Sequence, residues 1–324
     1  MAKILILGGG GMIGQKLISK LLNEGLAPYR ELDIVAFDLG FAPDALAGVQ
    51  NIRGSLTDEA ALRQLCAQRP DVVFHLASIV SGEAEENFDK GWDINMFPTW
   101  TLLQALRAEH LASKGVYVPR VIFTSSIAVF GGPFEGEISD NFLSAPQTSY
   151  GSQKAICELM LSDFSRKGFV DGLSLRLPTI CVRPGKPNLA ASSFFSGIIR
   201  EPINGETAYL PVDDQVQHWF ASPKAAAAFL THAATLESAA LMGRRALNLP
   251  GVSCTVAEQI ESLRRVVGQK AVDLIISRPD PLVERIVSGW PRAFDPKRAI
   301  ALGFCADVDF DAIIQTYLDE DFRP

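Results

Sequence analysis

The chain has 324 residues, of which 48% are hydrophobic, so it can bury the core of one large domain or two modest ones. Its formal net charge of −7 argues against a nucleic-acid partner, because such a partner requires a basic surface. Five scattered cysteines without a C-x-x-C pair argue against a disulfide framework or a zinc site and fit the cytoplasm. The apolar run after Met1 is too short for a signal peptide or a membrane span, so no membrane partner is expected.

The first half of the chain alternates short β-rich runs with longer segments of helical spacing. The runs that we expect to be strands are residues 3–7, 33–37, 51–53, 72–76, 121–124 and 173–177. Because these runs are apolar and alternate with helices, they predict an α/β fold of the Rossmann type, a doubly wound parallel sheet covered on both faces. A ligand then binds at the carboxyl ends of the strands.

After Leu177 the chain changes character. Prolines and glycines break residues 179–214 into loops and short elements, whereas residues 225–228 predict a helix and residues 246–249 a further strand. We therefore expect a larger domain over residues 1–177, with about 215–250 returning to its sheet. A smaller, discontinuous lobe takes up most of 178–324 and binds the substrate.

A glycine-rich run, GGGGMIG, follows the first predicted strand at residues 8–14 and precedes a helical pattern. As G-x-x-G-x-x-G it gives a tight turn, a close backbone approach to a pyrophosphate and close helix–strand packing. The phosphates then lie at the helix N-terminus, where free N–H groups favour anions. The residues expected to contact a dinucleotide here are Gly8, Gly11, Met12, Ile13 and Gly14. The run by itself leaves open a purely structural turn.

Asp38 ends the second predicted strand. An acid about 20 residues beyond the glycines is where a ribose diol is held, because a carboxylate accepts both hydroxyls and repels a 2′-phosphate. No arginine follows Asp38 directly, so NAD rather than NADP is the expected cofactor, and the domain over residues 1–177 is expected to bind it. The alternative is a loop carboxylate in water.

Tyr150 and Lys154 form the most informative pair. Residues four apart lie on one helix face, so the phenol and the ammonium can point into the same cleft. A nearby cation favours the phenolate, which can take a proton. The spacing also recurs by chance in surface pairs, but here Ser126 ends the preceding predicted strand, where its hydroxyl can bond the reacting oxygen. The expected catalytic residues are Ser126, Tyr150 and Lys154.

Taken together, the motifs resemble the extended short-chain dehydrogenase/reductases, the family of NAD-dependent nucleotide-sugar epimerases, dehydratases and related dehydrogenases. The matching segments are the glycine run, Asp38, HLAS at 75–78, Asn95, SSIAVFG at 125–131, Tyr150 with Lys154, LRLP at 175–178, and FDPKRA with LGF at 294–304. The resemblance implies that Tyr150 is the general acid/base, that Ser126 orients the substrate oxygen, and that Lys154 binds the nicotinamide ribose.

The resemblance also implies further contacts to NAD. The residues concerned are Ser55, Leu56, Ala77, Ser78, Asn95, Pro178 and Ile180, in addition to Tyr150 and Lys154. Asn95 is expected to support the site, and Pro178 and Ile180 to flank the nicotinamide. The family usually has an acid in the adenine loop where this chain has Ser55, so a side-chain carboxylate to the adenine amine is not expected.

Departures from the family pattern reduce the number of reactions and substrates that we expect. The dehydratases of the family carry an Asp-Glu pair after the catalytic hydroxyl, whereas this chain has Ile127 and Ala128, so dehydration is not expected. Residues 181–185 and 217–224 differ from the corresponding segments of nucleotide-sugar enzymes, which weakens the case for a uridine-diphosphate handle. Arg183 can instead grip a carboxylate with two hydrogen bonds. Pairing of Arg183 with Asp213 or Asp214 is the alternative.

Within the family, the segments LPTICVRPG and ASSFFSG are most similar to the dehydrogenases of D-erythronate, a four-carbon sugar acid. This similarity implies NAD-dependent oxidation of a small, carboxylate-bearing sugar at C2 to the 2-keto acid. The residues expected around the substrate are Ser81, Ser125, Ser126, Tyr150, Thr179, Arg183, Ser192, His218 and Trp219. Packing is an open alternative for His218 and Trp219, and a helix cap for Ser192.

Two other functions stay open. A nucleotide-sugar 4-epimerase of the family uses the same catalytic set, and a non-catalytic NAD-sensing protein shares the fold but commonly lacks the Tyr/Lys pair. By resemblance we expect a homodimer, formed through helices around residues 97–111 and 150–167. The four histidines show no metal-ligand spacing, and no metal is expected.

Overall fold

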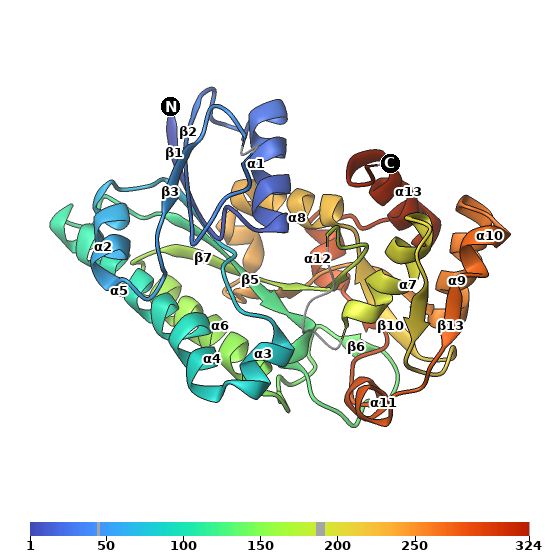
Figure 1. Cartoon of the computed structure of the whole chain (residues 1–324). Helices are drawn as coiled ribbons and strands as arrows, with labels where there is room; N and C mark the ends of the chain where they lie inside the picture. Colours follow the sequence, from blue (N-terminus) through green and yellow to red (C-terminus); the bar gives the residue numbers. More distant parts are fainter. Residues whose placement is uncertain (44–45, 186–191, 324) are drawn as a thin grey trace.

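The computed structural model of the protein describes residues 1–43, 46–185 and 192–323, so residues 186–191 of the expected loop stretch lie outside it. A seven-stranded sheet runs through the larger part of the molecule (Figure 1). Its strands, in order across the sheet, are β11 (Ala246–Asn248), β7 (Asp171–Leu177), β5 (Arg120–Ser126), β4 (Val72–His75), β1 (Ala2–Leu7), β2 (Leu32–Asp38) and β3 (Gln50–Arg53). All neighbouring strands are parallel, which confirms the predicted Rossmann-type sheet.

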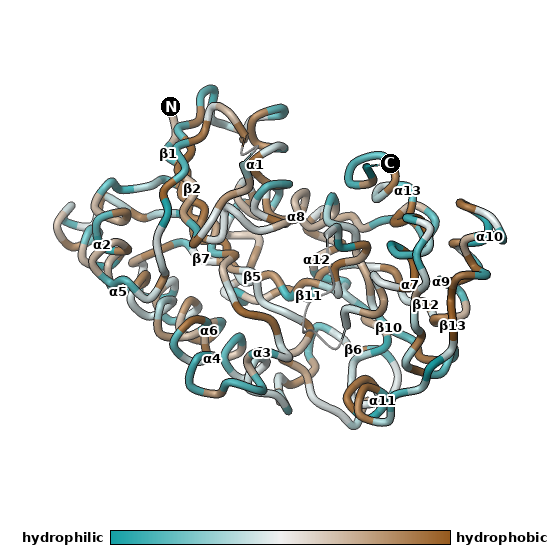
Figure 2. The backbone as a smooth tube through the Cα atoms, in the orientation of Figure 1, coloured by the Kyte–Doolittle hydropathy of each residue, from teal (hydrophilic) through white to brown (hydrophobic). Residues whose placement is uncertain are grey.

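Helices cover both faces of this sheet (Figure 1). One face carries α1 (Met12–Glu24) and α8 (Pro223–Thr235); the other carries α2 (Glu59–Ala67), α5 (Phe97–Ala112) and α6 (Ser149–Arg166). Successive side chains of a strand point to opposite faces, so Ile4 and Ile6 pack toward α1 and α8 while Leu5 and Leu7 pack toward α2 and α5. Figure 2 shows the hydrophobic residues concentrated along the strands, with hydrophilic residues on the outside.

After β7 the chain leaves the large sheet and builds a smaller lobe. Its elements are β8 (Thr179–Ile180), α7 (Ser193–Ile203), β9 (Ala208–Leu210), β10 (Gln217–Ala221), β12 (Val252–Thr255), α9 (Val256–Val266), α10 (Gln269–Val272), β13 (Ile275–Ser277), α11 (Pro281–Ser288) and α13 (Phe310–Glu320). β10 lies between β8 and β12, and β9 pairs with β13. From the segment expected to return to the large sheet, α8 and β11 do so, whereas β10 pairs with β8 instead. The division into two domains at residue 177 stays a prediction.

The remaining elements are short and connect these layers. They are α3 (Ser81–Glu86), α4 (Phe88–Asn95), η1 (Ile127–Val129), β6 (Ile138–Ser139), η2 (Ser238–Leu241), β14 (Phe294–Asp295) and α12 (Lys297–Ala301). β6 and β14 pair in parallel and so join the segment after β5 to the C-terminal part of the chain. Among the described residues, none of the helices has the length and apolar content needed to cross a membrane.

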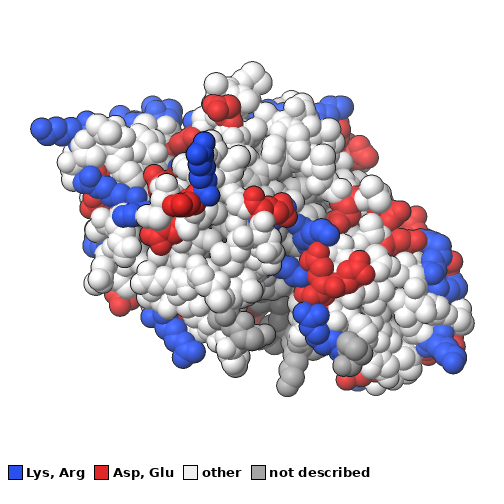
Figure 3. Space-filling model, turned by 90° about the horizontal axis from the view of Figure 1, so that it is seen from above, with Lys and Arg blue, Asp and Glu red and all other residues white. Residues whose placement is uncertain are grey.

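Ion pairs join α1 and α8 to the end of the C-terminal helix α13. Lys16 Nζ lies 2.9 Å from Glu320 Oε2 and 2.8 Å from Asp321 Oδ1, and Lys224 Nζ lies 3.1 Å from Glu320 Oε1. Seen from above, acidic and basic side chains are interspersed over this face of the molecule (Figure 3). The helix that follows the glycine run is therefore anchored to an element of the smaller lobe.

Four glycines of the run, Gly8, Gly9, Gly10 and Gly14, are required by close packing, since a Cβ on any of them would lie less than 3.0 Å from a neighbouring atom. Gly8 has a φ of +91°, and a Cβ there would lie 2.6 Å from the backbone nitrogen of Ala77. A Cβ on Gly14 would lie 2.3 Å from the carbonyl oxygen of Gly8, so α1 approaches β1 as closely as the motif predicts. Gly11 differs, because a Cβ there would meet nothing closer than 3.5 Å.

We expect Gly14→Ala to lower the free energy of unfolding by about 1–3 kcal/mol, because the added methyl group clashes with the backbone of Gly8 and Gly9 in the turn after β1. Alanine is the better helix former by about 1 kcal/mol, so helix propensity alone would act in the opposite direction. Urea unfolding without cofactor measures the difference. Gly11→Ala is the matched control and should stay close to the unmodified protein; equal stability of both variants would contradict the packing argument.

Candidate functional site

A cavity of about 750 Å³ opens at the carboxyl ends of the strands of the large sheet. Its wall comes from the ends of β1, β4, β5 and β7 on one side, and from β8, β10, α7 and the region of α11 on the other. The cavity therefore lies where the parallel sheet was expected to place a ligand, with the smaller lobe facing it.

The glycine run forms one end of this cavity. Gly8, Gly11, Met12, Ile13 and Gly14 all line it. The first turn of a helix leaves N–H groups without intrahelical partners, and in α1 this turn has neither a capping side chain nor an acidic residue. Backbone donors and the helix dipole are thus available to an anion, which fits the pyrophosphate of a dinucleotide.

Of the residues expected at the adenosine end, Asp38 contacts the glycine run. Asp38 Oδ2 accepts a hydrogen bond of 3.0 Å from the Gly10 N–H. The Ser55 and Thr57 hydroxyls bond each other at 2.7 Å, and Leu56 is buried in the core. None of Asp38, Ser55 and Leu56 belongs to the lining of the cavity, so their contacts to a cofactor stay predictions.

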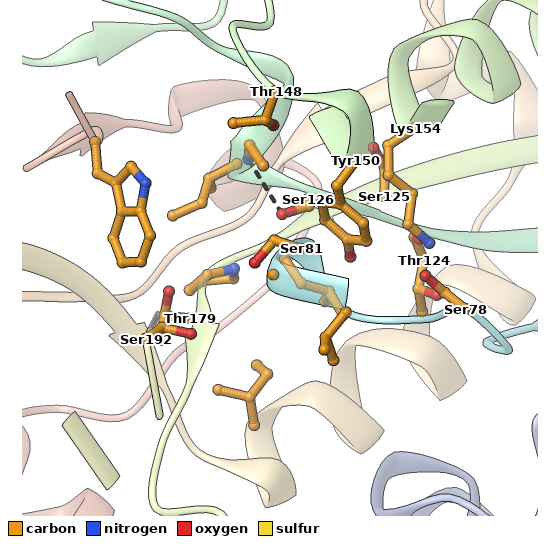
Figure 4. A pocket seen from close by; sticks show the side chains of 18 of the residues that line it. Ser78, Ser81, Thr124, Ser125, Ser126, Thr148, Tyr150, Lys154, Thr179 and Ser192 are labelled. Carbon is orange, nitrogen blue, oxygen red and sulfur yellow. Dashed lines mark hydrogen bonds between the residues drawn. The ribbon is translucent and has the colours of Figure 1, made fainter. Parts of the chain in front are cut away.

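The three expected catalytic residues converge on the cavity. α6 begins after Thr148, whose hydroxyl accepts the Gly151 N–H at 3.1 Å, and this cap places Tyr150 in the first turn. Ser126 ends β5, and its Oγ accepts the Ala128 N–H at 3.1 Å. Figure 4 shows the Tyr150 ring between Ser126 and Lys154.

Lys154 is held in place by the strand that carries Ser126. Its buried Nζ donates to the Thr124 carbonyl at 2.8 Å and lies 5.5 Å from the centre of the Tyr150 ring. In the described part of the chain no carboxylate forms an ion pair with Lys154. Its charge is thus not neutralised by a nearby acid. Burial and the charge of Lys154 lower the pKa of His75 to about 3, so this neighbouring imidazole is neutral.

Asn95 and Ala77 lie behind the wall of the cavity. Asn95 Oδ1 accepts the Ile79 N–H at 2.9 Å, and its Nδ2 donates to Gln153 Oε1 at 2.8 Å. Asn95 therefore ties the loop after β4 to α6, but it does not line the cavity, so its expected contact with the cofactor stays a prediction. Ala77 packs on Gly8 and also lies outside the lining, whereas Ser78 and Ser81 of the same loop are part of it.

A buried ion pair joins β7 to α6, the helix that carries Tyr150 and Lys154. Arg176 of β7 contacts both carboxylate oxygens of Glu158 on α6, with Nη2 to Oε2 at 2.7 Å and Nε to Oε1 at 2.9 Å. Ser125 Oγ donates to Glu158 Oε1 at 2.5 Å. The hydroxyl of Ser125, although at the cavity wall, is thus engaged by this pair, which was not expected from the sequence.

Arg183 lines the cavity, together with the predicted residues Pro178, Thr179, Ile180 and Ser192. Its Nε donates to the Ile180 carbonyl at 3.1 Å, and burial lowers the pKa of its guanidinium without neutralising it. Among the described residues no carboxylate pairs with it.

The alternative partners of Arg183 are engaged elsewhere. Asp213 Oδ1 accepts the Gln215 N–H at 2.7 Å, and Asp214 Oδ1 accepts from the Gln215 amide at 2.8 Å. Neither acid forms an ion pair with Arg183, so this arginine faces the cavity as a cation without an acidic partner in the described part of the chain.

His218 lines the cavity and Trp219 does not, whereas both were expected to line it. Neighbouring residues of a strand point to opposite sides, so in β10 His218 faces the cavity and Trp219 faces away. Trp219 packs 5.5 Å from the Phe294 ring, and its Nε1 donates to the Leu249 carbonyl at 3.2 Å. Trp219 is thus a packing residue.

Several lining residues carried no signal in the sequence. They are Glu85, Gln147, Thr148, Arg200, Arg285 and Trp290. Arg285 and Trp290 come from the region of α11, which no motif or spacing connects to the catalytic residues. Thr148 is an exception in retrospect, since a threonine two residues before the tyrosine is a typical helix cap.

Comparison with known proteins gives a consistent picture. A model of the NAD dependent epimerase/dehydratase family matches residues 4–239. The D-erythronate dehydrogenase of Cupriavidus necator is 45% identical over 324 residues, 98% of each chain, and that of Haemophilus influenzae is 40% identical over 98% of this chain and 99% of its own. The crystal structure of the nucleoside-diphosphate-sugar epimerase from Agrobacterium tumefaciens is 48% identical, with a TM-score of 0.94, and the match covers 99% of this chain and 94% of that one.

Proposed function

The chain belongs to the NAD dependent epimerase/dehydratase family and is an NAD-dependent oxidoreductase, and from this premise we propose that it oxidises a small sugar acid at C2. The substrate that we propose is D-erythronate or a similar aldonate, and the product is the 2-keto acid. Two relatives at 45% and 40% identity over nearly their whole length are D-erythronate dehydrogenases, which supports this choice.

The cofactor fits the cavity end formed by the glycine run. The backbone of Gly11, Met12 and Ile13, at the uncapped start of α1, would hold the pyrophosphate. Asp38 would take the ribose diol, and Pro178 and Ile180 would flank the nicotinamide. When bound, NAD supplies the acceptor for the hydride that leaves C2.

The catalytic residues would move the proton. Tyr150 removes the proton of the C2 hydroxyl, and the Ser126 hydroxyl holds the same oxygen as it becomes a carbonyl. Lys154, fixed by the Thr124 carbonyl at 2.8 Å, keeps a positive charge near the Tyr150 ring. That charge stabilises the phenolate that Tyr150 needs as a base.

Arg183 carries the proposal for an acid as substrate. It lines the cavity that Tyr150 and Ser126 also line, and no carboxylate among the described residues pairs with it. A half-buried guanidinium without an acidic partner is stabilised by binding an anion, and a carboxylate matches its two-pronged geometry. A substrate carboxylate would therefore complete the site.

Purified protein given NAD and D-erythronate is expected to produce reduced nicotinamide, followed by its absorbance. Tyr150→Phe should keep the affinity for NAD, measured by titration, and lose turnover by about 10²–10⁴-fold, since only the acid–base group is removed. Turnover of a nucleotide sugar, with none of any four- to six-carbon aldonate, would exclude the proposed reaction. Unchanged turnover in Tyr150→Phe would exclude the proposed base.

Arg183→Ala is expected to raise KM for sugar acids by about 10- to 100-fold, the usual effect of losing hydrogen bonds to a charged group. KM for neutral polyols should change little. Arg292→Ala, which removes an exposed arginine that is not part of the lining, is the matched control. Equal losses on acids and polyols would speak against a carboxylate at Arg183.

A nucleotide-sugar 4-epimerase is the second candidate, because the Agrobacterium tumefaciens protein of 48% identity is a nucleoside-diphosphate-sugar epimerase. The catalytic set serves either reaction. Stoichiometry separates them, since an epimerase regenerates its NAD in each turnover and a dehydrogenase accumulates reduced cofactor. A thermal shift with NAD and no turnover of any substrate would instead indicate an NAD-sensing protein.

We also propose that the protein forms a homodimer through α5 and α6. These adjacent helices expose Phe97, Trp100 and Leu111 on α5 and Leu159 on α6, with Leu159 72% exposed. Light scattering should give twice the monomer mass of 35.1 kDa, and Leu159→Glu should shift it toward the monomer. Leu143→Glu, a change in a similarly exposed leucine away from these helices, is the control. A monomer at all concentrations would refute the dimer.

A further inference from the structure

Thr179 and His218 form a hydrogen-bonded pair in the wall of the cavity. β8 runs parallel to β10, in a register that places Thr179 opposite Phe220. His218, two residues before Phe220, points to the same side of the strand. Thr179 Oγ1 lies 2.7 Å from His218 Nε2, so one of these two atoms donates to the other.

The other ring nitrogen decides which atom donates. His218 Nδ1 lies 3.0 Å from the Pro291 carbonyl oxygen, which can only accept, so Nδ1 carries a hydrogen. The ring is 2% exposed, and this burial lowers the pKa of His218 to about 4. The imidazole is therefore neutral at pH 7, its single hydrogen is on Nδ1, and Nε2 is a bare acceptor.

The packing of the ring keeps this arrangement in place. His218 stacks on Phe195, with the ring centres 5.2 Å apart and the planes 3° from parallel. Trp290, whose ring centre is also 5.2 Å away, covers it from the region of α11. A ring enclosed in this way does not turn over to exchange its two nitrogens without disturbing both neighbours.

Toward the cavity, the hydroxyl of Thr179 can act only as a hydrogen-bond acceptor. Its only hydrogen is donated to His218 Nε2, so toward the cavity the oxygen offers lone pairs and no donor. It can accept a hydrogen bond from a hydroxyl group. It cannot donate to a carboxylate, and it gains nothing from a methyl or methylene group.

We infer that Thr179 is a specificity-determining residue that accepts a hydrogen bond from a hydroxyl group on C3 or C4 of the substrate. The inference rests on the proposed function, in which Arg183 binds the carboxylate and Tyr150 with Ser126 acts on the C2 hydroxyl. A 2,3-dihydroxy acid then satisfies the site. A 2-hydroxy acid without further hydroxyls lacks the bond, and a dicarboxylic acid brings a second acceptor against an acceptor.

The test compares Thr179→Val with Thr179→Ser on two substrates, D-erythronate and 2-hydroxybutanoate, which has no hydroxyl beyond C2. We expect Thr179→Val to lower kcat/KM for D-erythronate about tenfold, the usual effect of one lost hydrogen bond, and to leave 2-hydroxybutanoate unchanged. Thr179→Ser, which keeps the hydroxyl, should stay within about twofold on both. An unchanged affinity for NAD shows that the variants are folded.

The outcomes distinguish the role of Thr179 from the proposed function of the enzyme. Equal losses on both substrates, or no loss on D-erythronate, overturn the role of Thr179 and leave the proposed function standing. An unmodified enzyme that oxidises neither acid overturns the proposed function and this inference with it. If Thr179→Val does not fold, nitrogen-15 NMR of the unmodified protein decides: we expect His218 with Nδ1 protonated and Nε2 bare near pH 7, and a protonated Nε2 would overturn the inference.

Discussion

The buried charge pair of Arg176 and Glu158 is the constraint on which the rest of the site depends. Both side chains are withdrawn from water, and loss of either partner would leave an uncompensated buried charge, which costs about 3–5 kcal/mol. The pair joins β7 to α6, and Ser125 adds β5 through its bond to Glu158. β5 carries Ser126, α6 carries Tyr150 and Lys154, and β7 leads into the segment that holds Thr179. The ion pair therefore holds these side chains in fixed positions relative to one another.

The polar groups that line the cavity differ in the kind of substrate group that each can bind. Arg183 is a donor and a cation, and it suits an anionic group. Thr179 is an acceptor, because His218 takes its hydrogen. In the proposed reaction, Tyr150 and Ser126 act on the hydroxyl group that loses its proton. A small molecule with a carboxylate and several hydroxyls therefore presents a complementary set of groups, which agrees with the sugar acid that we propose.

The histidines do not contribute charge to this site. Burial lowers the pKa of His75 to about 3 and that of His218 to about 4, so both rings are neutral at physiological pH. The positive charge in the wall of the cavity then comes from lysine and arginine side chains, among them Lys154 and Arg183. Each histidine acts through a hydrogen bond instead, His75 with Thr99 and His218 with Thr179.

The sequence by itself determined the large sheet, the glycine run and the placement of Tyr150 and Lys154 on one helix face, because each depends on a local pattern. Apolar runs alternate with helical spacing, Gly14 must lack a side chain at a close contact, and Tyr150 and Lys154 share a helix face through their spacing alone. Only the tertiary structure decided that β10 pairs with β8, that His218 rather than Trp219 faces the cavity, and that Asn95 lies behind its wall. The sequence of a short strand does not decide which of its faces is buried, because that depends on the strands with which it pairs, and these are distant in the chain.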